Sequence, residues 1–117
     1  MDKPLHEQKC VPCEGGVPSL QRDEALKLAA EVNGWNLATD AKSISHEYTF
    51  KDFNEALGFI NAVGALAESE GHHPDIHCAW NKVKLELSTH AIGGLSNNDF
   101  ILASKINRLP EVQKATS

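Results

Sequence analysis

The stretch ISHEYTFKDFNEALGFINAVGALA, residues 44–67, decides the fold class because it carries two different hydrophobic periods in succession. Over residues 44–50 apolar and polar side chains alternate, which predicts a β-strand. From Phe53 the apolar residues recur every three or four positions, which predicts an amphipathic helix with Asp52 as its N-cap. The predicted helical stripe consists of Phe53, Ala56, Leu57, Ile60, Val63, Gly64 and Ala67.

Two further apolar residues of this helix, Phe59 and Leu66, lie off one edge of the stripe. They either widen the face that packs on the core or contact a second subunit. The second interpretation favours a homodimer or homotetramer, and both interpretations stay open at the level of sequence.

The same two periods predict five further elements on either side. They are a helix over 21–32, a short strand over 35–38, strands over 76–80 and 83–90 joined by a tight turn, and a last helix over 96–109. The order α-β-β-α-β-β-α with two hairpins implies an α+β fold, in which three helices pack on one face of a four-stranded antiparallel sheet. Ser96 and Asp99 have the spacing of a capping box at the start of the last helix. Alternation places Ile76, Cys78 and Trp80 on the buried face of their strand.

Length and composition predict one globular domain. The chain has 117 residues, of which 41% are hydrophobic and 23% charged, and this is enough to bury a core without metal or disulfides. Residues 1–18 lack a periodic pattern and are expected to form an irregular N-terminal arm. The folded domain is expected over residues 19–117.

The charge and the apolar runs exclude several classes of function. A net charge of -5 argues against nucleic-acid binding, which needs a clustered excess of lysine and arginine, and against attraction to anionic membranes. No apolar run approaches the roughly 18 residues that span a bilayer, and no signal peptide is recognisable. We therefore expect a cytoplasmic protein with reduced cysteines.

Three histidines and one aspartate near the C-terminus are the strongest functional signal. His72 and His73 follow the long helix, His90 ends the last predicted strand, and Asp99 lies in the first turn of the last helix. Imidazole can donate and accept protons near neutral pH, so this group predicts proton-transfer chemistry. Asp99 either orients an imidazole or only caps its helix.

Metal and thiol chemistry are the alternatives at this level. Cys10 and Cys13 have the spacing of half a zinc site, but no second cysteine pair follows. We expect no bound catalytic metal, and an inert pair in the arm is favoured over a structural or redox one. Cys78 is expected to be inert packing rather than a nucleophile.

The motifs of this region resemble those of the pterin-4a-carbinolamine dehydratases. The resemblance rests on Glu68-x-x-x-His72-His73-Pro74, Trp80, Asn81-Lys82-Val83, Leu87-Ser88-Thr89-His90, Gly94-Leu95-Ser96, Asp99 and Gly34-Trp35. It covers about residues 19–109, and the motifs are specific because several unlike residues coincide at fixed spacing. The fold of that family agrees with the predicted order of elements.

The resemblance implies a hydro-lyase that removes water from a 4a-hydroxytetrahydropterin to give quinonoid dihydropterin. This step recycles the tetrahydrobiopterin-type cofactor of aromatic amino-acid hydroxylases, and a functional link to such a hydroxylase is implied. His72, His73 and His90 would line the pterin pocket and share the acid and base roles, without any cofactor. Other residues that the resemblance implies as orienting groups or substrate contacts are Glu68, Asp99, Ser88, Thr89 and Trp35.

A non-catalytic alternative uses the same fold. In that interpretation the chain is an oligomeric partner or regulatory protein that needs no proton-transferring histidines. The intact set of His72, His73 and His90 favours the enzyme.

Overall fold

The computed structural model describes residues 4–10 and 18–115 of the chain. The helices are α1 (Arg22–Ala29), α2 (Phe53–Glu70) and α3 (Asn97–Asn107), and the strands are β1 (Asn36–Leu37), β2 (Ile44–Thr49), β3 (Asp75–Ala79) and β4 (Lys82–Leu87). Three short 3-10 turns complete the described elements: η1 (Leu5–Glu7), η2 (His90–Ile92) and η3 (Pro110–Lys114). No helix within the described ranges is long and apolar enough to cross a lipid bilayer.

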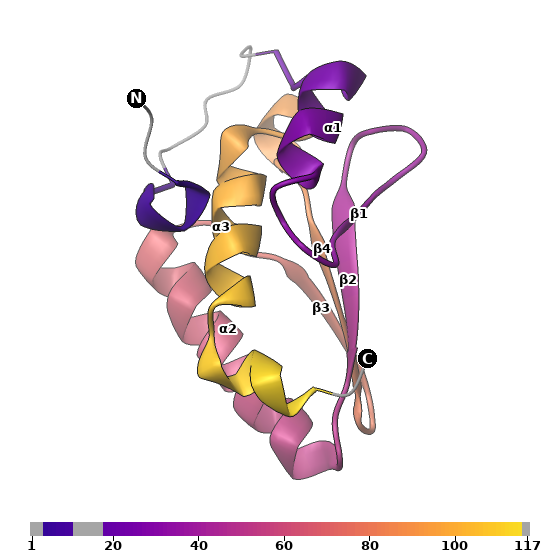
Figure 1. Cartoon of the computed structure of the whole chain (residues 1–117), viewed down its shortest axis with the longest axis vertical. Helices are drawn as coiled ribbons and strands as arrows, with labels where there is room; N and C mark the ends of the chain where they lie inside the picture. Colours follow the sequence, from indigo (N-terminus) through magenta and orange to yellow (C-terminus); the bar gives the residue numbers. More distant parts are fainter. Residues whose placement is uncertain (1–3, 11–17, 116–117) are drawn as a thin grey trace.

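The four strands form one antiparallel sheet in the order β1-β2-β4-β3. Both predicted hairpins are present, and β2 joins them by pairing with β4, so that Ile44 lies opposite Leu87. The three helices lie together on one face of the sheet (Figure 1). The predicted α+β fold is therefore confirmed.

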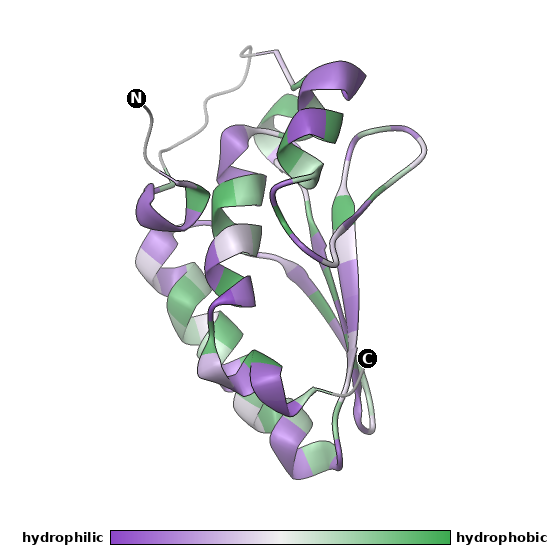
Figure 2. Cartoon of the chain, in the orientation of Figure 1, coloured by the Kyte–Doolittle hydropathy of each residue, from purple (hydrophilic) through white to green (hydrophobic). Residues whose placement is uncertain are grey.

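The core fills the space between the helices and the sheet, and Figure 2 shows the apolar bands of the helices and strands that line it. Helix α2 begins where the sequence predicts, because the Asp52 carboxylate accepts a hydrogen bond from the Glu55 backbone N–H at 2.9 Å. It ends at Gly71, which adopts the left-handed conformation (φ 68°) that favours glycine.

The buried face of α2 is rotated from the predicted stripe. Phe59, which the pattern places off the edge, is fully buried, and its ring packs against Tyr48 and Phe50 with centroids 4.6 and 5.2 Å apart. Phe53 and Leu57, which the stripe places inside, are 47% and 38% exposed. For Phe59 the first interpretation is therefore correct, because this residue widens the face that packs on the core. The apolar residues of α2 that stay uncovered are Phe53 and Leu57.

Strand β3 corrects a second expectation. Ile76 and Cys78 lie opposite Leu85 and Val83, so alternation assigns them to the correct face. Because β3 is an edge strand, the helices do not cover that face of it, and all five residues of β3 are exposed. Trp80, expected in the core, is 67% exposed at the tight turn into β4.

Two irregular segments also differ from the predicted pattern. The strand expected to reach His90 ends at Leu87, and the loop that follows contains the 3-10 turn η2. Within the arm, Leu5 is buried in the core, so the described part of the arm is packed on the domain. Cys13, the partner of Cys10 in the predicted pair, lies outside the described residues.

Candidate active site

Asp99 is the centre of the candidate site. It is the third residue of α3, is completely buried, and accepts hydrogen bonds through both carboxylate oxygens. Oδ2 accepts from the Ser96 backbone N–H at 3.0 Å and from the Thr89 hydroxyl at 2.9 Å. The predicted capping box is therefore present, since the Ser96 side chain in turn accepts from the Asp99 backbone.

The second oxygen of Asp99 holds His72. Nε2 of the imidazole lies 2.6 Å from Oδ1, and the His72 side chain is only 12% exposed. A short contact between a ring nitrogen and a buried carboxylate fixes both the orientation of the ring and the position of one of its protons. The two alternatives for Asp99 are thus both realised: it caps α3, and it contacts an imidazole.

The end of α2 places His72 at this carboxylate. The backbone N–H of His72 still bonds to the Ala67 carbonyl at 3.3 Å, while Gly71 turns the chain out of the helix. Pro74 then disfavours helical geometry at His73, and the chain enters β3.

His73 has a different partner from His72. Its Nε2 lies 3.5 Å from a carboxylate oxygen of Glu68, and the two side chains are 56% and 81% exposed. An exposed pair of this kind contributes little to stability. Both side chains are therefore largely exposed to solvent.

His90 begins the turn η2 directly after Thr89 and is exposed. Thr89 is buried and bridges to Gly94, whose carbonyl accepts from the Thr89 N–H at 2.7 Å, so the loop that carries His90 is closed at its base. The Thr89 hydroxyl and the His72 ring meet on the same carboxylate. The segments that carry the three candidate histidines therefore converge on Asp99. Ser88, also predicted to lie at the site, is half-buried beside Thr89.

Trp35 lies outside this group. Its indole N–H donates to the Asn107 side chain at 3.0 Å, and its ring is 5% exposed. Asn107 is eight residues beyond Asp99 in α3, which corresponds to about 12 Å along the helix axis. The structure thus places Trp35 in the core at the opposite end of α3.

Sequence reasoning missed a second polar group, formed by Glu70 and Lys105. The Lys105 ammonium lies 2.7 Å from the Glu70 carboxylate, and the two side chains are 15% and 11% exposed. They are 35 residues apart, and nothing in the local pattern signals the contact. The sequence predicts Ser96 as a helix cap and as part of the family motif, but not the contact of its hydroxyl with the Thr89 hydroxyl at 2.8 Å.

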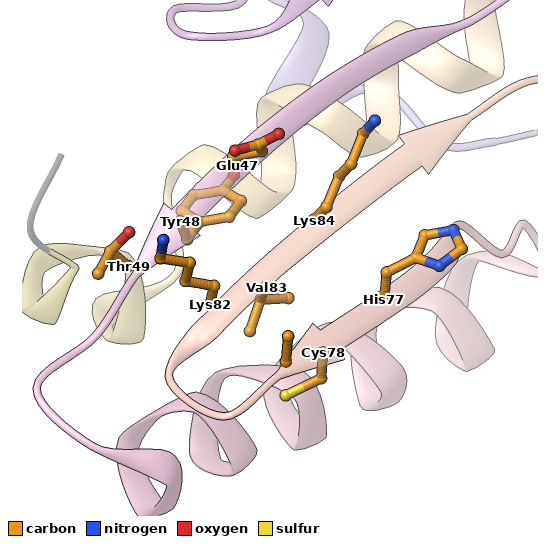
Figure 3. Close-up of a pocket in the computed structure, with 9 residues that line it drawn as sticks. Glu47, Tyr48, Thr49, His77, Cys78, Lys82, Val83 and Lys84 are labelled. Carbon is orange, nitrogen blue, oxygen red and sulfur yellow. The ribbon is translucent and has the colours of Figure 1, made fainter.

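A separate hollow of about 310 Å³ lies on the sheet face opposite the helices (Figure 3). None of the candidate residues lines it. Its walls come mainly from outward-facing side chains of β2, β3 and β4, including Glu47, His77, Lys82 and Lys84. This hollow is therefore distinct from the group around Asp99.

The group around Asp99 can perform proton transfer. Asp99 occupies Nε2 of His72, which leaves Nδ1 as the ring nitrogen available to a ligand. Two exposed imidazoles, His73 and His90, extend from the neighbouring segments. These side chains are of a type that can donate and accept protons.

Comparisons with known sequences identify the family of the chain. The sequence model of the family described as pterin 4 alpha carbinolamine dehydratase matches residues 18–109. A protein of Cupriavidus pinatubonensis, provisionally named pterin-4-alpha-carbinolamine dehydratase 1, is 44% identical over 109 residues, covering 93% of this chain and 94% of its own. A protein of Rubrobacter xylanophilus with the same provisional enzyme name is 44% identical over 90% of this chain and 97% of its own.

Solved structures agree with the fold. The crystal structure of a transcriptional coactivator/pterin dehydratase from Brucella melitensis superposes with a TM-score of 0.72 at 31% identity, covering 76% of this chain and 95% of that one. A pterin dehydratase-like protein described as a RuBisCO assembly factor in the alpha-carboxysome superposes with a TM-score of 0.55 at 18% identity, covering 64% of this chain and 87% of that one, and supports the fold alone. From its motifs, its fold and these matches, the chain belongs to the pterin 4 alpha carbinolamine dehydratase family.

Proposed function

We propose that this chain dehydrates a 4a-hydroxytetrahydropterin to quinonoid dihydropterin by histidine acid–base catalysis. The observation that carries the proposal is the 2.6 Å contact between His72 and the buried Asp99, with two further imidazoles on the adjoining segments. Membership of the dehydratase family supports the substrate class.

In the proposed reaction, one imidazolium protonates the 4a-hydroxyl, which leaves as water when its bond to carbon breaks. The lone pair of the adjacent ring nitrogen forms the new double bond to that carbon, and a neutral imidazole accepts the proton that this nitrogen releases. Because the nitrogen supplies the electron pair, the reaction needs no metal. General acid–base catalysis of this kind contributes about 10²- to 10⁴-fold in rate.

His72, His73 and His90 are the proposed acid–base groups. Asp99 orients His72 and balances its charge when the ring is protonated. Glu68 lies against His73 and is proposed to orient it or the pterin amide edge. A contact to the pterin is also proposed for the backbone of Ser88. Thr89, whose backbone N–H and carbonyl both bond to Gly94, and Trp35, at the opposite end of α3, are not among the proposed pterin contacts.

The proposed reaction implies a metabolic role and a location for the protein. The product would return to the tetrahydrobiopterin-type cofactor of an aromatic amino-acid hydroxylase, and no cofactor beyond the pterin substrate is required. The described cysteines Cys10 and Cys78 are free thiols, which suits a reducing cytoplasm.

The uncovered edge of the sheet and the exposed Phe53 and Leu57 support a homodimer or homotetramer.

A non-catalytic partner or regulatory protein is the second candidate. The Brucella melitensis structure carries the description transcriptional coactivator as well as pterin dehydratase, which is the observation that favours it. A protein of this kind would not need an imidazole held on a buried carboxylate beside two exposed imidazoles, so we rank it second.

Turnover of chemically prepared 4a-hydroxytetrahydropterin by purified, chelator-treated protein tests the proposal. We expect dehydration above the spontaneous rate, and a loss of about 10²-fold or more in kcat/KM for His73→Ala and for His90→Ala. His77→Ala, an exposed histidine in the separate hollow on the sheet, is the matched control and should retain full activity.

The proposal fails if wild type and His73→Ala turn over the substrate at the same rate. A rate restored only by added zinc would instead indicate a metal-dependent activity. Because acid and base are both needed, kcat/KM should fall at acid and at alkaline pH. A flat profile from about pH 5 to 9 would contradict histidine chemistry.

A further inference from the structure

The described part of the N-terminal arm contacts the two helix ends that carry His72 and Asp99. The turn η1 lies beside α3 in Figure 1, and Leu5 is only 8% exposed within the core. A buried leucine anchors the arm on the domain, because its exposure to water would cost roughly 1.5–3 kcal/mol. The arm is therefore part of the folded unit around the site.

Cys10 brings the arm to the end of α2. Its backbone N–H donates to Oε1 of Glu70 at 2.9 Å, and Glu70 is the last residue of α2, two positions before His72. The other oxygen of Glu70 accepts from the Lys105 ammonium at 2.7 Å. One largely buried carboxylate thus joins the arm, α2 and α3.

Cys10 also reaches the start of α3. Its thiol lies 3.6 Å from the backbone carbonyl of Asn98, the residue before Asp99. Asn98 and Lys105 are seven residues apart in α3, so they lie on one face of that helix. This face of α3 therefore contacts the arm near the start of the helix, at Asn98, and contacts Glu70 near the end of the helix, at Lys105.

The ionisation of these groups suits a structural contact. Burial alone would raise the pKa of Glu70, but the hydrogen bonds from Lys105 and from Cys10 outweigh it and lower the pKa, so the carboxylate is charged at neutral pH. Burial, followed by the charge of Glu70, raises the pKa of the Cys10 thiol to about 12. The thiol is accordingly protonated and unreactive, and can donate to the Asn98 carbonyl.

We propose that the arm, through Leu5 and through the contact of Cys10 with Glu70 of α2, is a brace that holds the end of α2 against the start of α3 and so fixes the His72–Asp99 contact. Cys10 and Glu70 are positioning residues in this scheme, and neither touches the substrate. A 2.6 Å contact between side chains of two different elements tolerates little relative movement. The kinetic consequence rests on the proposed dehydratase function, whereas the structural consequence does not.

The test compares the ring nitrogens of His72 in the free protein. Long-range ¹H–¹⁵N spectra of ¹⁵N-labelled protein report the tautomer and hydrogen bond of each imidazole, and His72→Gln identifies the resonances of interest. Glu70→Gln leaves one of the two donors without an acceptor, and Lys105→Arg keeps a charged donor. We expect the His72 resonances to move in Glu70→Gln and to stay close to wild type in Lys105→Arg.

The matched control is Asn107→Ala, which removes two side-chain hydrogen bonds at the far end of the same helix. Leu5→Ala perturbs the arm without touching Glu70, and Leu109→Ala is its control beyond the end of α3. We expect Leu5→Ala to move the His72 resonances in the same direction as Glu70→Gln, and neither control to do so. For Glu70→Gln we expect kcat/KM to fall roughly tenfold, less than the 10²-fold that about 1 Å of misplacement can cost.

Each outcome decides the proposal. It is overturned if the His72 resonances stay unchanged in Glu70→Gln and Leu5→Ala, or if the controls move them equally. If wild type has no dehydratase activity but Glu70→Gln and Leu5→Ala alone move the His72 resonances, the brace stands and the proposed function fails. If wild type is active and the resonances do not respond, the function stands and the brace fails.

Discussion

Asp99 caps α3 with one carboxylate oxygen and holds His72 with the other. Oδ2 accepts from Ser96 and Thr89, and Oδ1 lies 2.6 Å from the imidazole. Because the carboxylate is completely buried, each oxygen is committed to its donors. The geometry of the candidate site is thereby tied to the first turn of a helix, and a change at this residue affects stability and activity together.

Asp99→Asn should reveal this double dependence. The amide has one oxygen and one NH₂ group, so at least one former donor to the carboxylate meets another donor. We expect a loss of about 1–3 kcal/mol in the free energy of unfolding, measured in urea, because a buried donor is left unsatisfied. In the dehydratase assay, kcat/KM should fall by at least roughly tenfold, because the ring of His72 is no longer oriented.

Ser96→Ala separates the cap from the site. It removes the side-chain cap at a cost of about 1 kcal/mol but keeps the contact of Asp99 with His72. Its kcat/KM should therefore stay within a few-fold of wild type. An equal loss of activity in Asp99→Asn and Ser96→Ala would contradict a specific function of the His72–Asp99 contact.

His46 should make stability depend on pH. Its ring stacks on Tyr48 with centroids 4.0 Å apart. Burial lowers its pKa from the usual value of 6.5, and the hydrogen bond that the ring donates to the Glu47 carbonyl opposes this shift. Between its folded pKa and 6.5 the unfolded chain holds a proton that the folded chain lacks. The free energy of unfolding should thus fall as pH drops below 6.5, by up to about 1.4 kcal/mol per pH unit for this group.

Urea unfolding between pH 5 and 7.5 measures this contribution. His46→Gln cannot titrate and should flatten the part of the slope that His46 causes, whereas His77→Gln, on an exposed strand, should leave the slope as in wild type. Slopes that are identical in wild type and His46→Gln would refute the assignment.

The sequence predicts the elements well because local rules place them. Asp52 at the N-cap, Gly71 at the end of α2 and the capping box of Ser96 and Asp99 all act over a few residues. The same short-range signals place His72 directly after the end of α2 and Asp99 in the first turn of α3. Because residues 72–73 precede and residues 89–90 follow the predicted hairpin of β3 and β4, the sequence also predicts that these two segments lie near each other.

What the sequence could not predict depends on neighbours distant in the chain. Ile76 and Cys78 lie on the expected face of β3, yet they are exposed because β3 is an edge strand, and strand order is not a local property. Phe59 is buried because it meets Tyr48 and Phe50 of another element. The contacts of Glu70 with Lys105 and Cys10 span 35 and 60 residues and leave no periodic trace.

Gly34→Ala should be strongly destabilising. Gly34 has φ of 83°, in the left-handed region, and an added Cβ would lie 2.3 Å from the His46 ring nitrogen. We expect a loss of about 1–3 kcal/mol from backbone strain, with a further loss from the clash, seen as a lower urea midpoint. Gly58→Ala is the matched control, because it lies within α2 with nothing near its Cβ position, and it should gain about 0.5–1 kcal/mol. Equal effects at both positions would contradict the structure around Gly34.

The uncovered edge of the sheet predicts self-association. β3 pairs with β4 alone among the described strands, and the apolar side chains of Ile76 and Trp80 are 38% and 67% exposed there. An exposed edge strand can pair with a strand of another chain, and a lysine on it opposes that pairing. We expect light scattering to give a multiple of the chain's mass, and Ile76→Lys to shift the population toward monomer. Thr39→Lys adds the same charge to an exposed turn and should leave the mass unchanged. A monomeric wild-type chain at high concentration would rule this interface out.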